Sequence, residues 1–233
     1  MTSVLVVGGG GRLGRAILEA LASGDAFRAA GSLGRRLPDA PLPGSAPAFL
    51  DLETALAADP SAVVLDVSSP DGATERVHRV ADARRALVVG VTGLDGAAEA
   101  AIAEAAGRIP VVRAPNFSPG VALLVRALAE IARAKGPSWD IAILDRHHRA
   151  KRDAPSGTAK LLASVVEGES ASFRQGGIVG EHRVFVTGEE EELVLTHRAF
   201  SRRVFARGAL LAAAFAASAR PGLYGMADVL GLA

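Results

Sequence analysis

The chain contains no cysteine, and this absence excludes several kinds of chemistry. Disulfide bonds, thiolate metal ligands and cysteine nucleophiles all need a side chain that the sequence does not supply. A protein without disulfides fits the reducing cytoplasm, which is where we expect it.

The chain also lacks an excess of charge of either sign and has no long hydrophobic run. The formal net charge is only +1, whereas broad binding to nucleic acid or to a membrane surface needs a basic face. The longest apolar run, Ala209 to Ala219, is shorter than the roughly 20 residues that span a bilayer. Met1–Ser3 leads straight into apolar residues, without the basic region and cleavage site of a signal peptide. We therefore expect a soluble protein that binds neither nucleic acid nor membranes.

What is present is the composition of a globular protein. The 233 residues are 49% hydrophobic and 22% charged, which is enough for one large domain or two modest ones. In the first half, short apolar runs alternate with amphipathic stretches, as in a parallel sheet whose two faces are covered by helices. The sequence therefore predicts an α/β fold with an N-terminal Rossmann-type, doubly wound parallel sheet. The predicted strands are Ser3–Val7, Phe27–Gly31, Val63–Val67, Leu87–Val89 and Val111–Arg113, the predicted helices Arg12–Ala22, Gly72–Arg85 and Gly96–Ala106, and the proline-rich segment Leu37–Pro47 is a predicted loop.

The pattern changes after residue 118. The strands that follow have a single helix among them, which predicts a smaller α+β domain with an open mixed sheet. We predict three parts: a dinucleotide-binding domain (1–118), a substrate-binding and oligomerisation domain (119–200), and a C-terminal segment (201–233) that returns to the first domain. The predicted elements are the helix Val121–Lys135, ended by Gly136 and Pro137, the strands Asp140–Asp145, His182–Thr187 and Leu193–His197, and the helices Gly157–Val166 and Arg203–Ala217.

A glycine-rich turn follows the first predicted strand. Gly8 and Gly11 remove side chains that would keep a pyrophosphate from the backbone, and Gly14 lets the next helix pack closely on the strand. The position of the turn between a strand and a helix favours dinucleotide binding over the alternative, a plain tight turn.

The second predicted strand is followed by arginines where NAD-selective sites place an acid. Arg35 and Arg36 suit the 2′-phosphate of NADPH through charged hydrogen bonds. We therefore expect NADPH to be preferred, with NADH as the other cofactor. The alternative is that both arginines are solvated loop residues.

The stretch from His147 to Thr158 is the most informative in the chain. Neighbouring residues on a strand point to opposite sides, so His147 and His148 are expected to serve different partners. Ser156 can cap the helix that follows, whose first N–H groups can bind a carboxylate. With Lys151 nearby, the segment indicates a pocket for a small acid. Three alternatives remain: a metal site, which the neighbouring cations disfavour, a structural histidine pair, and a solvated basic patch.

The chain resembles the dihydrodipicolinate reductase family of lysine and diaminopimelate synthesis. The motifs that carry the resemblance occur in order along nearly the whole chain. They are Gly8–Gly14, Asp66–Gly72, Gly90–Gly93, Asn116–Ser118 with Gly120, His147–Arg149 with Lys151, Asp153–Ala159, Ile178–His182 and Thr196–Ala199.

The resemblance implies NAD(P)H-dependent reduction of 4-hydroxy-tetrahydrodipicolinate to tetrahydrodipicolinate, and a homotetramer built by the second domain. It places Arg12 and Leu13 along the pyrophosphate, and Gly90 and Thr92 with Asn116, Phe117 and Ser118 beside the nicotinamide. It also implies that His148, Lys151, Gly157 and Thr158 hold the dicarboxylate substrate. No metal is expected.

The reaction itself calls for a proton donor. Hydride transfer to a carbon conjugated with an imine leaves an enamine, which must be protonated. Lys151 is the leading donor, because burial and neighbouring cations would make its ammonium give up a proton more readily. His147 is the rival donor, or it orients the substrate.

This chain also departs from the family pattern. Ala150 stands where many members have a third histidine. The link from Glu167 to Gly177 is short, where longer members have a strand and a loop that help to cover the substrate. Arg174 is expected to replace part of that cover, and the short link puts substrate affinity in question.

Two other functions are open. One is a related imino or amino acid dehydrogenase with a similar two-domain structure. The other is a non-catalytic NADPH-binding module, which would have no need of His147, Lys151 and Thr158 together.

Overall fold

The protein is seen in a computed structural model that describes residues 1–134 and 139–232. The chain divides into two compact units. The first holds residues 1–117 and 203–231, and the second holds residues 118–202. The predicted helix end at Lys135, Gly136 and Pro137 lies outside the described residues.

The first unit is built on a seven-stranded sheet with the order β11-β6-β5-β4-β1-β2-β3. All neighbouring strands run parallel. The chain order reverses on the two sides of β1, so the predicted doubly wound sheet is confirmed. The strands are β1 (Thr2–Val7), β2 (Phe27–Leu33), β3 (Ala48–Phe49), β4 (Val63–Asp66), β5 (Leu87–Val89), β6 (Pro110–Arg113) and β11 (Gly222–Tyr224).

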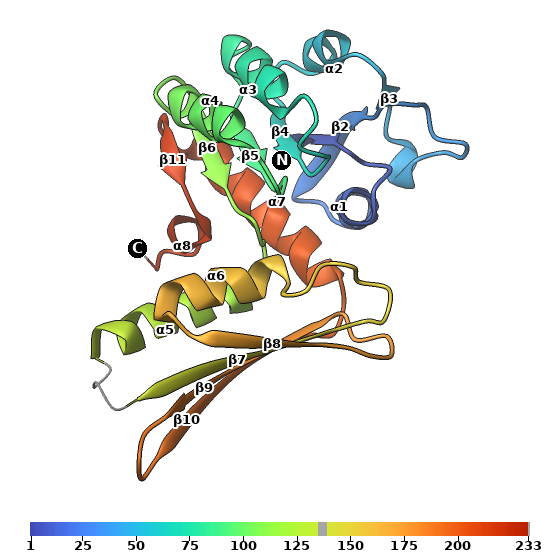
Figure 1. The fold of residues 1–233 in the computed structure, drawn as a ribbon. Coiled ribbons are helices and arrows are strands. Elements are labelled where there is room, and N and C mark those ends of the chain that lie inside the picture. The colour runs from blue at the N-terminus through green and yellow to red at the C-terminus, as the bar shows by residue number, and fades with distance from the viewer. Residues whose placement is uncertain (135–138, 233) are drawn as a thin grey trace. The chain divides into compact units, whose positions relative to one another are not determined.

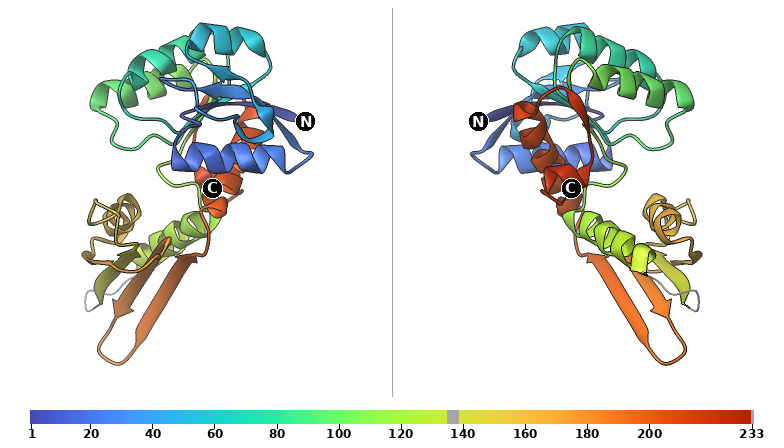
Figure 2. Two further views of the ribbon diagram at one scale, coloured as in Figure 1. Left: turned by 90° about the vertical axis from the view of Figure 1, so that its right-hand side faces the viewer. Right: turned by 90° about the vertical axis from the view of Figure 1, so that its left-hand side faces the viewer.

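Helices cover both faces of this sheet. Helices α1 (Arg12–Ala22) and α7 (Arg203–Ser218) lie on one face, and α2 (Leu52–Ala58), α3 (Ala73–Asp82) and α4 (Gly96–Ala106) lie on the other (Figures 1 and 2). A short helix, α8 (Met226–Val229), follows β11, and one turn of 3-10 helix interrupts the predicted loop at Pro43–Ser45. None of the described helices is long and apolar enough to cross a membrane.

Burial explains why the strands are apolar on both faces. Leu5, Val64 and Val111 lie in a hydrophobic core that also takes Val77 from α3 and Ile102 from α4. The last long helix, α7, packs against α1 and against β4, β5 and β6. The C-terminal part of the chain thus completes the first unit.

The second unit is a four-stranded sheet with the order β10-β9-β7-β8. Strand β8 is parallel to β7, whereas β9 is antiparallel to both β7 and β10, so the predicted mixed sheet is confirmed. Helices α5 and α6 both lie on one face (Figure 1), and β9 and β10 form a long hairpin (Figure 2). The elements are α5 (Pro119–Ala134), β7 (Asp140–His147), α6 (Gly157–Val166), β8 (Glu169–Arg174), β9 (Gly180–Thr187) and β10 (Glu192–Ala199).

Strand β8 corrects the sequence analysis, which predicts only a short link from Glu167 to Gly177. Residues 169–174 pair with the whole second half of β7, from Ala142 to His147. Phe173 is the only large apolar residue of this edge strand, so the alternation that marks a half-buried strand is missing from the sequence. The short link therefore still supplies a strand, and that strand carries Arg174 next to the end of β7.

Candidate active site

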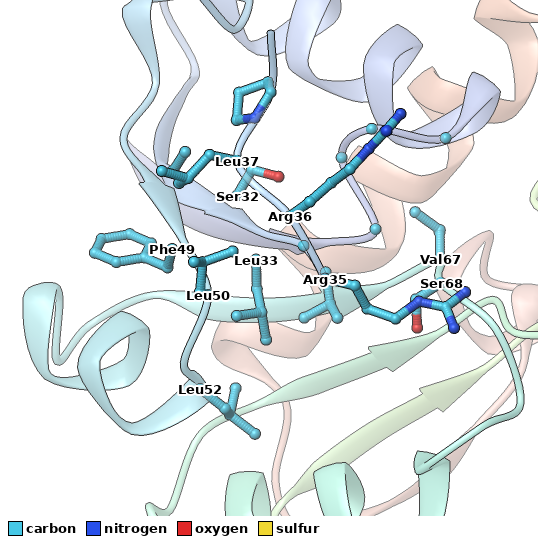
Figure 3. Close-up of a pocket in the computed structure, with 18 of the residues that line it drawn as sticks. Ser32, Leu33, Arg35, Arg36, Leu37, Phe49, Leu50, Leu52, Val67 and Ser68 are labelled. Atoms are coloured by element: carbon cyan, nitrogen blue, oxygen red, sulfur yellow. The ribbon is translucent and has the colours of Figure 1, made fainter.

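A cavity of about 900 Å³ lies at the carboxyl ends of β1, β2 and β4, where the strand order reverses. Ligands of doubly wound sheets bind at this position. The glycine turn lines the cavity with Gly8 to Gly11, and the segment after β2 lines it with Arg35 and Arg36. Figure 3 shows Arg35 extending from the end of β2 towards Val67 and Ser68.

At two positions near the glycine turn, the structure has no room for a side chain. Gly8 has φ +90°, and a Cβ there would come within 2.8 Å of the Ser68 backbone. A Cβ on Gly14, in the first turn of α1, would lie 2.2 Å from the Gly8 carbonyl oxygen. No side chain caps α1, so its N-terminus is suited to an anion. Arg12 is exposed and Leu13 half-buried in the same first turn.

Arg76 fixes the opposite wall of the cavity, a role that the sequence analysis does not identify. Its guanidinium donates to the Asp66 carboxylate at 2.8 Å and to the backbone oxygens of Ser69 and Asp71 at 2.7 and 2.6 Å. Asp66 in turn accepts from both the backbone N–H and the hydroxyl of Ser68. The turn that touches Gly8 is therefore held by one arginine and one buried acid.

The residues predicted to flank the nicotinamide fall into both units. The Phe117 ring lies against Gly90 at the end of β5, where a Cβ would come within 2.4 Å of the ring. Thr92 is exposed and Asn116 half-buried near the ends of β5 and β6. Ser118 opens the second unit, and its hydroxyl lies 3.1 Å from Nε2 of His197. Burial, and after it the charge on the neighbouring His182, lower the pKa of His197.

The predicted substrate residues come together at the end of β7 and the start of α6. His147 is the last residue of β7 and is buried, while His148 is half-buried. Gly157 and Thr158 form the first turn of α6, and the Ser156 hydroxyl caps this helix by accepting from the N–H of Ala159 at 3.1 Å. This arrangement directs the positive end of the helix dipole to the loop that carries the histidines.

Lys151 sits in the loop between β7 and α6 and is held by a neighbouring acid. Its Nζ lies 2.8 Å from both carboxylate oxygens of Asp153. The Lys151 side chain is only 22% exposed, whereas the Asp153 side chain is 56% exposed. The closest charge to Lys151 is therefore an anion, and not the cations that the sequence analysis invoked.

The centre of this site is Asp145, which the sequence analysis does not identify. Its side chain is fully buried, and Oδ1 lies 2.8 Å from Nδ1 of His147 and 3.4 Å from Nε2 of His182. Oδ2 accepts from the N–H of Ser156 at 3.0 Å and from the guanidinium of Arg174 at 2.9 Å. Burial alone would raise the pKa of Asp145, but these partners outweigh burial and hold it far below its usual range.

A metal ion is the alternative reading of this cluster. Asp145, His147 and His182 each offer one ligand atom, and the three atoms lie within 4.8 Å of one another. However, the guanidinium of Arg174 is bonded to the same carboxylate and already balances its charge, which weakens it as a ligand for a divalent metal. The arrangement is better described as a buried network of charged hydrogen bonds.

The signals for the unpredicted members of this network are weak in the sequence. Asp145 lies two residues before His147 on one strand, so both side chains point to the same face. His182 belongs to a motif that carries the family resemblance, and it pairs with Asp145 across β7 and β9. Only the fold shows that Arg174 of β8 reaches the same carboxylate.

Comparison with known proteins gives the family. Two family models match the chain: the one described as dihydrodipicolinate reductase, N-terminus, over residues 2–117, and the one described as dihydrodipicolinate reductase, C-terminus, over residues 120–230. The 4-hydroxy-tetrahydrodipicolinate reductase of Myxococcus xanthus (strain DK1622) is 40% identical over 274 aligned residues, covering 99% of this chain and 98% of the relative. The enzyme of the same name from Xanthomonas campestris pv. campestris (strain B100) is 42% identical, with 97% of each chain covered.

A solved structure shows the same fold. The dipicolinate-bound dihydrodipicolinate reductase from Paenisporosarcina sp. TG-14 superposes with a TM-score of 0.82 at 21% identity, covering 98% of this chain and 99% of that one. The order of the motifs, the two matched halves and the identity to full-length relatives agree. This chain belongs to the dihydrodipicolinate reductase family.

Proposed function

We propose that this protein reduces 4-hydroxy-tetrahydrodipicolinate to tetrahydrodipicolinate with NADPH, in the synthesis of lysine and diaminopimelate. The observation that carries the proposal is the arrangement around Asp145: one buried carboxylate holds both His147 and the N-terminus of α6. A proton donor and an anion-binding helix end are thereby fixed together, in a chain whose close relatives bear the name of this reductase.

The first unit has the features that a dinucleotide needs. Gly8 has a backbone conformation that residues with a side chain rarely adopt, and the N-terminus of α1 has no side-chain cap. The cavity beside them measures about 900 Å³. Gly8, Gly11, Arg12 and Leu13 would hold the pyrophosphate, and Gly90 with Asn116 to Ser118 would lie beside the nicotinamide. When bound, the cofactor supplies a hydride, and the protein contributes alignment and charge.

NADPH is proposed as the preferred cofactor because of the charges at the end of β2. The Arg35 side chain is 85% exposed, and it forms a long ion pair of 3.7 Å with Asp71, which is also solvent-exposed. Such a weak ion pair leaves the guanidinium available to a phosphate. Arg36 extends from the same segment along the cavity.

In the second unit, the substrate's two carboxylates need partners and its reacting carbon needs a proton. We assign the carboxylates to His148, Lys151 and the N–H groups of Gly157 and Thr158. We assign the proton to His147, because its Nδ1 lies 2.8 Å from the buried carboxylate of Asp145 at the end of β7, whereas the partner of the Lys151 ammonium is the exposed Asp153. The hydroxyl group leaves as water with a proton from the neighbouring carbon, which forms a double bond conjugated with the imine; the hydride would then add to this conjugated system, and the enamine that results would be protonated.

An open sheet face supports the proposed homotetramer. Helices α5 and α6 cover only one face of the four-stranded sheet (Figure 1). On the other face, Phe173 is 53% and Val194 43% exposed, next to a buried acid, Glu181, that is paired with Arg146. Exposed apolar patches rimmed by charge mark association surfaces. We propose that copies of the chain associate through this face, and that the enzyme works in the cytoplasm.

Turnover tests the proposal. The substrate is generated in place from pyruvate and aspartate semialdehyde by a condensing enzyme, and the loss of NADPH absorbance is followed. We expect substrate-dependent oxidation, and a loss of about 10²–10⁴-fold in kcat for His147→Gln if His147 donates the proton. NADPH binding without substrate-dependent oxidation would instead identify a non-catalytic module.

A further inference from the structure

The two carboxylate oxygens of Asp145 differ in the hydrogen bonds that they accept. Oδ2 has three aligned donors: the N–H of Ser156, the hydroxyl of Ser172 at 3.0 Å and the guanidinium of Arg174. Oδ1 is buried and faces His147 and His182, but has no aligned hydrogen bond within the described residues. The donors on Oδ2 come from the start of α6 and from β8, so they fix the plane of the carboxylate.

His147 shows the complementary pattern. Its Nδ1 is buried and lies 2.8 Å from Oδ1 of Asp145, again without an aligned hydrogen bond. A buried polar atom left in this state costs free energy and calls for an explanation. The fixed carboxylate supplies one, because an N–H on Nδ1 that turns towards Oδ1 sets the orientation of the ring and leaves Nε2 for the exchange of a proton.

Glycine at position 180 of β9 leaves room beside the other edge of the His147 ring. A Cβ built on Gly180 would come within 3.1 Å of Nε2, which is tighter than an ordinary van der Waals contact. His182 closes a third side, with its ring 5.3 Å from the His147 ring in an edge-on arrangement. The imidazole is therefore flanked by Asp145 and His182, and the absence of a side chain on Gly180 leaves its Nε2 edge open.

From this geometry we propose that Asp145 is a positioning residue for proton transfer: its carboxylate, fixed by α6 and β8, orients the His147 imidazole and keeps a proton on Nδ1. The proposal rests on the proposed function, in which His147 donates the proton. In that step the Nε2–H bond of the imidazolium breaks and a C–H bond forms on the enamine. The ring is left neutral with its proton on Nδ1 towards Asp145, and water restores the second proton.

The test is a double-mutant cycle on kcat. Asp145→Asn keeps the shape of the side chain and removes its charge, and we expect kcat to fall about 10- to 100-fold, since the donor is still present. Asp145→Glu restores the carboxylate and is expected to recover most of this loss. In a His147→Gln background, Asp145→Asn should change kcat less than twofold, because residues that act as a unit are not additive.

Two controls separate positioning from folding. Ser164→Ala removes an exposed hydroxyl of α6 that donates to the Leu161 backbone oxygen and not to Asp145, so kcat should stay within about threefold of the original. The dissociation constant for NADPH should be unchanged in all these variants, because Asp145 contacts His147, His182, Ser156, Ser172 and Arg174, none of which is assigned to the cofactor. If Asp145→Asn does not fold, Arg174→Lys replaces it, because it removes the guanidinium bond that fixes Oδ2, and kcat should fall without a change in NADPH affinity.

Each outcome is informative. Losses that multiply in the double variant, or a normal kcat in Asp145→Asn, would overturn the positioning role. A weakened NADPH affinity or an Asp145→Glu variant as slow as Asp145→Asn would show that the acid only supports the fold. A normal kcat in His147→Gln would instead reject the donor assignment of the proposed function.

Discussion

Replacing Gly14 by Ala should strain the phosphate turn by an amount that the structure allows to be estimated. The added Cβ would lie 2.2 Å from the carbonyl oxygen of Gly8 and 2.7 Å from the Cα of Gly9. Ordinary contacts begin near 3.4 Å, so one of the two backbone segments must move by about 1 Å. Both are main chain, so no flexible side chain can yield.

The cost follows from general values. Overpacking of a tight site costs about 1–3 kcal/mol, and up to about 1 kcal/mol of this is recovered because Ala favours a helix more than Gly does. The remainder, up to about 2 kcal/mol, can appear in two places. If α1 keeps its position, the turn from Gly8 to Gly11 shifts and NADPH affinity falls by up to about 30-fold. If the turn keeps its position, the free energy of unfolding falls by the same amount.

Gly10→Ala is the matched control. A Cβ on Gly10 meets nothing within 4 Å, although the residue belongs to the same turn. Urea denaturation of the cofactor-free protein measures the change in the free energy of unfolding. Fluorescence titration with NADPH measures the change in affinity. If Gly14→Ala matched Gly10→Ala in both measurements, the argument that Gly14 is needed for close packing would be wrong.

Three further predictions concern the cofactor, acid stability and assembly. The double variant Arg35→Ala/Arg36→Ala should weaken NADPH binding at least tenfold, because charged hydrogen bonds contribute about 1.5–3 kcal/mol. Its affinity for NADH should not change. Tighter binding of NADH than of NADPH by the original protein would refute the preference. The pKa of Asp59 is lowered from 3.8 to about 2, since hydrogen bonds from Ser3 and Ser61 and the charge of Arg28 outweigh burial. Its contribution of about 2 kcal/mol is therefore full above pH 5 and lost as the pH falls to 2, so the stability difference between the original protein and Asp59→Asn should shrink by that amount over this range. If copies associate as proposed, light scattering should show a lower mass for Val194→Asp but not for Leu211→Asp, at a similarly exposed site on α7. Equal masses would argue against association through the open sheet face.

The sequence was informative where local patterns decide the structure. Apolar runs such as Val63–Asp66 and the glycines after Val7 predict buried parallel strands and a phosphate turn, because burial and backbone freedom act over a few residues. Helix α2 escaped prediction because its seven residues form only two turns. Strand β8 escaped because its edge position lets polar side chains face solvent.

The site was only partly predictable for a different reason. His147, Lys151 and Thr158 lie within one short stretch, so their association can be read along the chain. The carboxylate of Asp145, by contrast, gathers Ser172, Arg174 and His182, which reach it only through strand pairing. No spacing in the sequence reports such contacts. Their discovery moves the assignment of the proton donor from Lys151 to His147.

The most direct test of the central claim is the ratio of kcat/KM for two cyclic imines, measured by NADPH oxidation. One is the dicarboxylate made from pyruvate and aspartate semialdehyde, and the other is a five-membered cyclic imine with a single carboxylate. A site in which the start of α6 and Lys151 each take a carboxylate should favour the dicarboxylate by about 10³-fold or more, since a buried partner left unpaired is costly. Equal values, or a preference for the monocarboxylate, would contradict the account and point to a related imino acid dehydrogenase.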